Sequence, residues 1–342
     1  MPDVSTTTTR RSNLLVLVGL LLAVAAVRLV LGRTVDGDGE VGVRLGIPAG
    51  LILELRLSTL VAALVSGAAL GLSGLGFQVL LRNALASPWV LGVSSGAGFG
   101  LILAAFLAGL GGPIGAFGSI LLLGGGLPAA AGGALLAMLV VAALARRLGG
   151  FDPVALVLCG VIVGATFGAG TMLVQHLVPN GVRGDFIGWL MGRVPELVPW
   201  WLLVVGASTV LVAVALGGRH ARWLDAACLS EDEATSLGVP LGRVRRAVFG
   251  TAGLLAAVAV CIVGPIAFVG LLAPHAARLL MGPRHDRLVV ASGMCGAGML
   301  VLADVVRQFI DLGGGRVPIG VVTALVGGPL FLLLLLRRSV VQ

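Results

Sequence analysis

The stretch STLVAALVSGAALGLSGLGFQVL, residues 58–80, contains no charged residue and is long enough to cross a membrane. A transmembrane helix needs about 20 mostly apolar residues, because the hydrocarbon core of a bilayer is about 30 Å thick. The stretch also contains Gly67, Gly71, Gly74 and Gly76. Small residues let such helices approach one another closely, since water does not drive helices together inside lipid. The segment therefore predicts a closely packed transmembrane helix.

The composition of the whole chain points the same way. Of its 342 residues, 58% are hydrophobic and 11% are charged, whereas soluble domains are about 45–50% apolar and about 25% charged. The net charge of +8 comes from arginines dispersed between apolar stretches. Such a distribution is typical of a membrane topology signal and does not indicate a nucleic-acid partner. The composition predicts a polytopic membrane protein.

Ten apolar stretches are candidates for transmembrane helices. They predict an all-α integral membrane protein with one polytopic domain, 14–336, between the tails 1–13 and 337–342. The predicted spans are 14–31, 58–80, 91–110, 118–145, 153–177, 199–217, 246–263, 266–280, 288–304 and 319–336.

The orientation follows from counting arginines on the two sides. With the N-terminus in the cytoplasm, the inner segments hold 15 arginines and the outer segments hold 7, while Arg28 lies within the first span. This excess predicts that both termini are cytoplasmic. It also places the connection 218–245, between the sixth and seventh spans, in the cytoplasm.

That connection contains LSEDEATSLGVP, residues 229–240, with three consecutive acids. Ser230 and Glu233 have the spacing of a capping box, in which each side chain bonds the backbone N–H of the other residue. Gly238 and Pro240 end the helix after about two turns. Because so short a helix is marginal alone in water, it must pack on something, which is either its own chain or a cytoplasmic partner.

The same stretch resembles the coupling segment of ABC importer permeases for iron–siderophores, haem and cobalamin. Three long blocks extend the resemblance in the right order: 56–98, 264–287 and 302–335. The family has two permease subunits of ten helices each, equal or different, which form a pore at their interface. Two cytoplasmic ATPases drive the transport, and a periplasmic or lipid-anchored binding protein delivers the chelate.

The resemblance implies a permease in the inner membrane of a bacterium that takes up a ferric siderophore or a related large chelate. The chain has no GxxxxGK[ST] phosphate-binding motif, so ATP and magnesium would bind the partner ATPases and this chain would hold no cofactor. The coupling helix would be formed by Ser230, Glu231, Asp232, Glu233, Ala234, Thr235, Leu237 and Gly238.

The resemblance also implies outward-facing arginines that pair with acids of the binding protein. The candidates are Arg56, Arg307 and Arg316. The family usually reads Arg-Leu-Pro-Arg where this chain has RLST, and Arg316 replaces a usual acid, so the docking charges are rearranged. The first outer loop, 34–54, carries four acids, for which solvent exposure and a contact with the binding protein are alternative interpretations.

Three places are candidates for a hinge or gate. Asp152 and Pro153 begin the fifth span as an N-cap and a first-turn proline, close to the inner gate of the family. Gly264 and Pro265 break the helical pattern, which indicates a kink or a hinge that other parts of the protein must cover. His275 is expected to be a hydrogen-bonded residue at an inner helix end, with a gating contact as the alternative.

Other function classes have weaker support. A transporter coupled to protons or sodium needs ionisable residues at depth, and Asp152 and Asp304 both lie near the ends of predicted spans. An enzyme needs a converging catalytic set, which the loose group His275, Arg278, His285 and Asp286 does not form. The four cysteines have no metal-ligand spacing.

Overall fold

The computed structural model describes residues 4–35, 41–310 and 316–339. It is helical apart from one antiparallel hairpin of two strands, β1 (Leu31–Val35) and β2 (Val41–Leu45). Its helices are α1 (Val4–Val30), α2 (Leu51–Leu80), α3 (Val93–Gly109), α4 (Gly112–Leu121), α5 (Leu123–Leu148), α6 (Pro153–Leu177), α7 (Asn180–Leu190), α8 (Trp200–Arg219), α9 (Ala221–Ala227), α10 (Glu231–Ser236), α11 (Leu241–Val263), α12 (Val269–Met281), α13 (His285–Val306) and α14 (Ile319–Ser339). Two short 3₁₀ turns cover Pro88–Leu91 and Arg307–Phe309.

Every predicted span overlaps an apolar helix. Among the described residues, seven helices are long and apolar enough to cross a membrane: α1, α2, α5, α6, α8, α11 and α13. Shorter apolar helices are α3, α4, α12 and α14. The predicted helical membrane fold is therefore confirmed. α1 begins at Val4, so most of the predicted N-terminal tail is helical.

The prediction of one continuous span over 118–145 is wrong, because α4 ends at Leu121. Gly124, Gly125 and Gly126 follow with φ angles of 63°, 77° and 82°, so α5 is regular only after this run. These angles lie in the left-handed region, which glycine adopts without a steric penalty. The glycine run thus breaks the helix inside a stretch that is apolar throughout.

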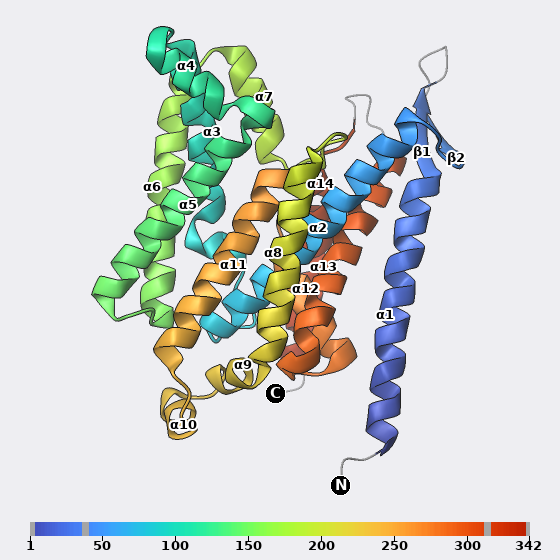
Figure 1. Cartoon of the computed structure of the whole chain (residues 1–342), viewed down its shortest axis with the longest axis vertical. Helices are drawn as coiled ribbons and strands as arrows, with labels where there is room; N and C mark the ends of the chain where they lie inside the picture. Colours follow the sequence, from blue (N-terminus) through green and yellow to red (C-terminus); the bar gives the residue numbers. More distant parts are fainter. Residues whose placement is uncertain (1–3, 36–40, 311–315, 340–342) are drawn as a thin grey trace.

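α2 lies at the centre of the bundle and contacts α13, α11, α12 and α8. Figure 1 shows it running obliquely behind α8. A Cβ atom on Gly74 would lie 1.7 Å from the carbonyl oxygen of Gly270 in α12, and one on Gly71 would lie 2.3 Å from that of Ser292 in α13. The backbones of these helices therefore touch, as the glycines of 58–80 predict.

The helices at the periphery of the bundle are mostly exposed, in contrast to α2. In the apolar window of α2, 78% of the residues are buried, compared with 22% in α6, 17% in α8 and 11% in α1. Exposed leucines and valines on these three helices need an apolar environment, either lipid tails or another protein subunit. The bundle consequently has an apolar belt around a closely packed centre.

The predicted outer loop 34–54 is in part regular structure. β1 and β2 pair with Leu31 opposite Leu45, and Glu54 lies in the first turn of α2. The other three acids of this loop, Asp36, Asp38 and Glu40, lie outside the described residues.

The hairpin and α10 lie at opposite ends of the bundle. α1 begins and α14 ends at the end that carries α9 and α10 (Figure 1). Near the same end, the side-chain amide of Asn13 in α1 donates a 2.9 Å hydrogen bond to the carbonyl of Leu280 in α12. Both terminal helices therefore reach the face of the molecule that carries the acidic helix.

Candidate functional site

The acidic helix α10 begins with the capping box that the sequence predicts. Ser230 Oγ accepts a hydrogen bond of 3.3 Å from the backbone N–H of Glu233. Glu233 Oε2 in turn accepts bonds from the backbone N–H of Ser230 at 3.0 Å and from its hydroxyl at 2.7 Å. Two N–H groups that the first turn leaves without helical partners are thereby satisfied.

α10 ends with an equally defined motif. Gly238 has a φ angle of 73°, and its N–H donates to the carbonyl of Thr235 at 2.9 Å. The N–H of Val239 donates to the carbonyl of Ala234 at 3.1 Å. This pair of bonds is a Schellman motif, and it needs a residue that tolerates the left-handed region. The predicted role of Gly238 as a helix stop is confirmed.

The three acids of α10 have three different environments. The carboxylate of Glu231 forms an ion pair with Arg245 of α11, and the hydrogen bond from Arg245 lowers the pKa of Glu231 below its ordinary value. Hydrogen bonds from Ser230 likewise lower the pKa of Glu233. Both carboxylates are therefore charged at neutral pH. Asp232 has no hydrogen bond or ion pair within the described part of the chain.

One face of α10 packs on its own chain and the other is open. The side chain of Ala234 is fully buried, and α10 contacts α9 and α11. Leu237 is 66% exposed and Leu229 is 41% exposed. Two exposed leucines beside a charged Asp232 form a surface suited to another protein, because apolar residues at the centre of interfaces gain from losing water. We call Leu229, Asp232, Ser236 and Leu237 the docking face.

The segment before α10 is bonded to the membrane helices. Asp225 of α9 accepts hydrogen bonds from the backbone N–H of His285 at 3.0 Å and lies 2.6 Å from Nδ1 of its ring. Arg82, just after α2, donates a 3.1 Å bond to the carbonyl of Ala227. The connection 218–245 is thus bonded to the segment just after α2 and to the start of α13, and its own Glu231 pairs with Arg245 near the start of α11.

Sequence reasoning missed Arg82, Asp225, Arg245 and His285 as members of this site. Arg245 lies 14 residues from Glu231, a separation at which charge pairing cannot be deduced from helix periodicity. The other contacts join residues 60 or more positions apart. The only available signal was the presence of charged residues at span ends on the predicted cytoplasmic side.

The predicted docking arginines lie in three different settings. Arg56 donates hydrogen bonds to the carbonyls of Leu29 at 2.6 Å and Val30 at 3.0 Å, which fixes the end of α1 against α2. Arg307 is 4% exposed. Arg316 is exposed and forms an ion pair with Glu196. Of the three, Arg316 is exposed, Arg56 is half-buried and Arg307 is buried.

Arg307 belongs to a buried charge cluster at the end of α13. Its Nε donates a 2.5 Å bond to Asp304, and the second oxygen of Asp304 pairs with Arg28 of α1. Asp304 is fully buried and Arg28 is 5% exposed. Two arginines around one carboxylate connect α1 to α13, which gives these residues a structural role in the single chain.

The predicted N-cap of α6 is confirmed. Asp152 Oδ2 accepts hydrogen bonds from the N–H groups of Val154 at 2.9 Å and Ala155 at 3.2 Å, with Pro153 in the first turn. Its neighbour Phe151 packs edge-on against Phe249 of α11, with ring centroids 5.3 Å apart. The segment just before α6 therefore packs on α11, the helix whose Arg245 pairs with Glu231 of α10.

The helix break at Gly264 and Pro265 is also confirmed. Residues 264–268 connect α11 to α12 without helical structure. The carbonyl of Val263 accepts from the N–H of Arg193 at 2.8 Å, and the carbonyl of Ile266 accepts from the Trp89 indole at 3.2 Å. Irregular backbone inside a membrane requires such partners. His275, half-buried in α12, also interacts with other residues of the chain.

Among the residues that the structure describes, no three His, Cys, Asp or Glu side chains could together hold a metal ion. The four cysteines are free, and Cys159, Cys261 and Cys295 are buried. The docking face of α10 contains two exposed leucines and an exposed acid.

Comparisons with known proteins identify the family of the chain. The model of the FecCD transport family matches residues 13–337. The vitamin B12 import system permease protein BtuC of Vibrio cholerae is 36% identical over 333 residues, which cover 96% of this chain and 95% of that protein. The iron(3+)-hydroxamate import system permease protein FhuB of Escherichia coli is 33% identical over 326 residues, which cover 94% of this chain and 46% of that protein.

The fold is similar to that of a solved transporter described as an ABC transporter of the metal-chelate type in an inward-facing conformation. The TM-score is 0.79 and the sequence identity is 29%. The match covers 96% of this chain and 99% of that chain.

Proposed function

Because the chain belongs to the FecCD transport family and is a permease subunit of an ABC importer, we propose that it imports a ferric siderophore or a related large chelate. The membrane would be the cytoplasmic membrane of a bacterium. The observation that carries the proposal is the exposed, doubly capped helix α10, in a chain that matches the family over residues 13–337.

The proposed topology has ten spans with both termini in the cytoplasm. The excess of arginines in the segments on the α10 side supports this orientation. The positions of the start of α1 and the end of α14 at that same face are consistent with it (Figure 1). α10 then faces the cytoplasm, where ATP is available.

The docking face of α10 would contact an ATPase subunit, one for each of two permease subunits. Its exposed leucines would lie in a recess of the ATPase, and Asp232 would pair with a basic residue there. ATP and magnesium would bind the ATPase. This chain would transmit the movement through the Glu231–Arg245 pair to α11 and through the Asp225–His285 contact to α13.

A second permease subunit, identical or different, would complete the pore. α6 exposes most of its apolar surface, including Val161, Ile162, Met172 and Leu173, and this face is a candidate for the subunit interface. The irregular segment 264–268 would act as the hinge during alternating access. A periplasmic or lipid-anchored binding protein would dock at the opposite end, near Arg316 and Glu196.

The proposed substrates share one chemical feature. A siderophore or a corrin ring surrounds its metal ion with its own ligands, so a permease for such a chelate needs no metal-binding residues of its own. The names of the two relatives, which carry vitamin B12 and iron(3+)-hydroxamate, support this class. The alternative, an ion-coupled secondary transporter, would have to use the Asp304 cluster, where the carboxylate is paired with two arginines.

The test is purification of the tagged chain from membranes, followed by reconstitution with whatever copurifies. We expect an ATPase subunit in the purified sample and ATP-dependent uptake of a ferric siderophore or of cobalamin into liposomes. The variant Asp232→Arg/Leu237→Arg should lose the ATPase, whereas Arg146→Gln, a change on the same side of the membrane, should retain it. Uptake driven by an ion gradient in the absence of any ATPase would contradict the proposal.

A further inference from the structure

An open apolar groove lies between α8 and α11, with α2 as its floor and α9 across one end. Its volume is about 280 Å³. Most of its lining is aliphatic, including Leu72, Leu75, Leu216 and Leu255. Small residues at Gly76 and Ala213 leave space between the helices. We call this feature the α8–α11 groove.

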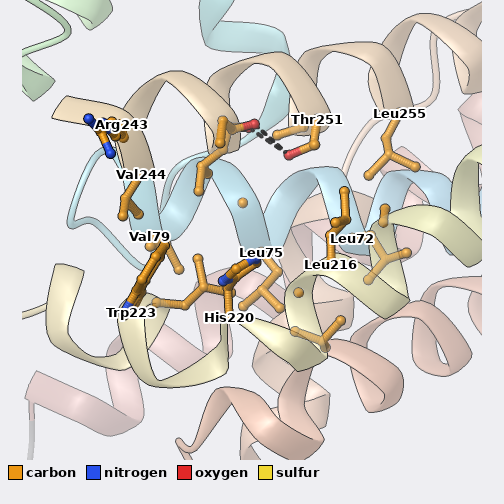
Figure 2. A pocket seen from close by; sticks show the side chains of 18 residues that line it. Leu72, Leu75, Val79, Leu216, His220, Trp223, Arg243, Val244, Thr251 and Leu255 are labelled. Carbon is orange, nitrogen blue, oxygen red and sulfur yellow. Dashed lines mark hydrogen bonds between the residues drawn. The ribbon is translucent and has the colours of Figure 1, made fainter. Parts of the chain in front are cut away.

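Polar groups of the groove gather at the end nearest α9. Figure 2 shows Arg243 and Trp223 at one end, and Leu216 and Leu255 toward the other. The ring of His220 stacks on Trp223 with centroids 4.8 Å apart. Thr251 bonds the carbonyls of Ala247 and Val248 within its own helix, so its hydroxyl is already satisfied. The groove therefore has one polar end and one apolar end.

The dimensions of the groove fit one leaflet of a membrane. Arg243 and Leu255 lie on the same helix, and a rise of 1.5 Å per residue separates them by about 18 Å. Half of the hydrocarbon core of a bilayer is about 15 Å. Tryptophan is typical of the level at which lipid head groups meet the acyl chains, so Trp223 marks the polar end as the membrane surface.

The charge at the polar end has no counterpart among the described residues. Arg243 is exposed and has no hydrogen bond or ion pair among the residues that the structure describes. Arg219 and Arg222, next in sequence to His220 and Trp223, are exposed as well. A guanidinium group binds phosphate oxygens well because of its charge and its several N–H donors. The occupant should be negatively charged where it meets Arg243.

We propose that the α8–α11 groove binds an anionic phospholipid of the leaflet on the α10 side. The head-group phosphate would lie against Arg243 beside Trp223, and one acyl chain would occupy the groove along Leu75, Leu72 and Leu216. The bound lipid would contact α8, α9 and α11, of which α9 and α11 also contact α10. The α8–α11 groove is a different site from the docking face, and the lipid is not the proposed cargo.

The experiment is native mass spectrometry of the purified protein with its copurifying subunits, titrated with phosphatidylglycerol or phosphatidylethanolamine of identical acyl chains. We expect phosphatidylglycerol to bind more tightly, and Arg243→Gln to weaken its binding about fivefold, the equivalent of about 1 kcal/mol. Ala247→Phe, which fills the groove, should weaken the binding of both lipids.

Matched controls use residues outside the groove. Arg146→Gln removes an exposed arginine at the end of α5, and Ala215→Phe adds a ring to an exposed position of α8 that does not line the groove. Neither should change lipid binding. Binding that Ala247→Phe leaves unaltered would overturn the site, and equal affinity for the two lipids would overturn its selectivity for negative charge.

A second measurement identifies the occupant directly. A photoreactive amino acid at Leu216, which is 43% exposed in the groove, is irradiated in native membranes. The expected product is this chain with the mass of one phospholipid added. A cross-link to another polypeptide, whether a second copy of the chain or a different subunit, would show that protein covers the groove and would overturn the proposal.

Discussion

Glu231 of α10 and Arg245 of α11 form an ion pair that joins the short acidic helix to a membrane-spanning helix. The Arg245 side chain is 12% exposed, whereas that of Glu231 is 55% exposed. The Arg245 side chain is thus held by the residues packed around it, whereas the more exposed Glu231 side chain has more room to move. In the proposed coupling, a force on α10 would reach α11 through this contact and through the packing of Ala234.

Charge reversal tests that connection. Arg245→Glu places two negative charges together at a site where the arginine side chain is 12% exposed, so we expect reduced ATP-driven uptake and some loss of thermal stability. The double variant Glu231→Arg/Arg245→Glu restores the attraction and should recover uptake. Equal uptake in the single and double variants would show that the pair does not transmit movement. Uptake and ATP hydrolysis are measured in the same liposomes.

Gly238 provides a test of the backbone geometry of α10. A valine at a φ angle of 73° costs about 1–2 kcal/mol, so Gly238→Val should distort the end of the helix. We expect a folded membrane domain with weakened retention of the ATPase and hydrolysis that is no longer coupled to uptake. Gly238→Asn is the matched control, since asparagine tolerates this conformation. Wild-type coupling in the valine variant would contradict the role of this helix.

The sequence allows the local structure of α10 to be predicted in detail, because its signals lie within ten residues. The capping box of Ser230 and Glu233 and the stop at Gly238 all form as the spacing indicates. The helix break at Gly264 follows from equally local rules. These features depend on backbone hydrogen bonds between near neighbours, which sequence spacing determines.

Long-range contacts could not be predicted in the same way. Arg307 has the sequence position of an outward-facing charge, yet packing of α1 against α13 buries it beside Asp304. The break at Gly124 had a local signal, three consecutive glycines, but the apolar character of 118–145 favoured one span. Which residues meet across the bundle depends on helix packing that periodicity does not encode.

The buried Asp304 cluster predicts that removal of the Asp304 charge strongly lowers the stability of the fold. Asp304→Asn would leave Arg28 and Arg307 buried without their counter-ion, and breaking a buried pair costs about 3–5 kcal/mol. We expect a lower unfolding temperature in detergent and a smaller folded yield. Asp286→Asn is the control on the same helix, because Asp286 is exposed and its pair with Arg284 at 3.3 Å should contribute little. Equal unfolding temperatures for the two variants would refute a structural role.

The close approach of α2 and α12 at Gly74 predicts that added volume at this position lowers stability. Gly74→Ala would place a methyl group 1.7 Å from the carbonyl oxygen of Gly270, so α2 and α12 would have to separate. We expect a loss of about 3 kcal/mol in the free energy of unfolding, measured by thermal denaturation in detergent. Gly132→Ala in α5 meets no atom within 4 Å and should be neutral or slightly stabilising. A neutral Gly74→Ala would mean that the helices can move apart freely.

The proposed orientation predicts which ends of the bundle react with a membrane-impermeant maleimide in intact cells. Ser236→Cys, on α10, should be labelled only after the membrane is opened, whereas Asp185→Cys, on α7, should be labelled from outside. The background variant carries Cys228→Ser, because Cys228 is exposed and the other three cysteines are buried. Ser236 belongs to the proposed docking face, so the opened membranes are first washed free of ATPase subunits; both cysteines then lie on exposed helical positions, and a difference in labelling reports the side of the membrane. Labelling of Ser236→Cys in intact cells would place α10 outside, where no ATPase could reach it, and would contradict the orientation and the coupling role together.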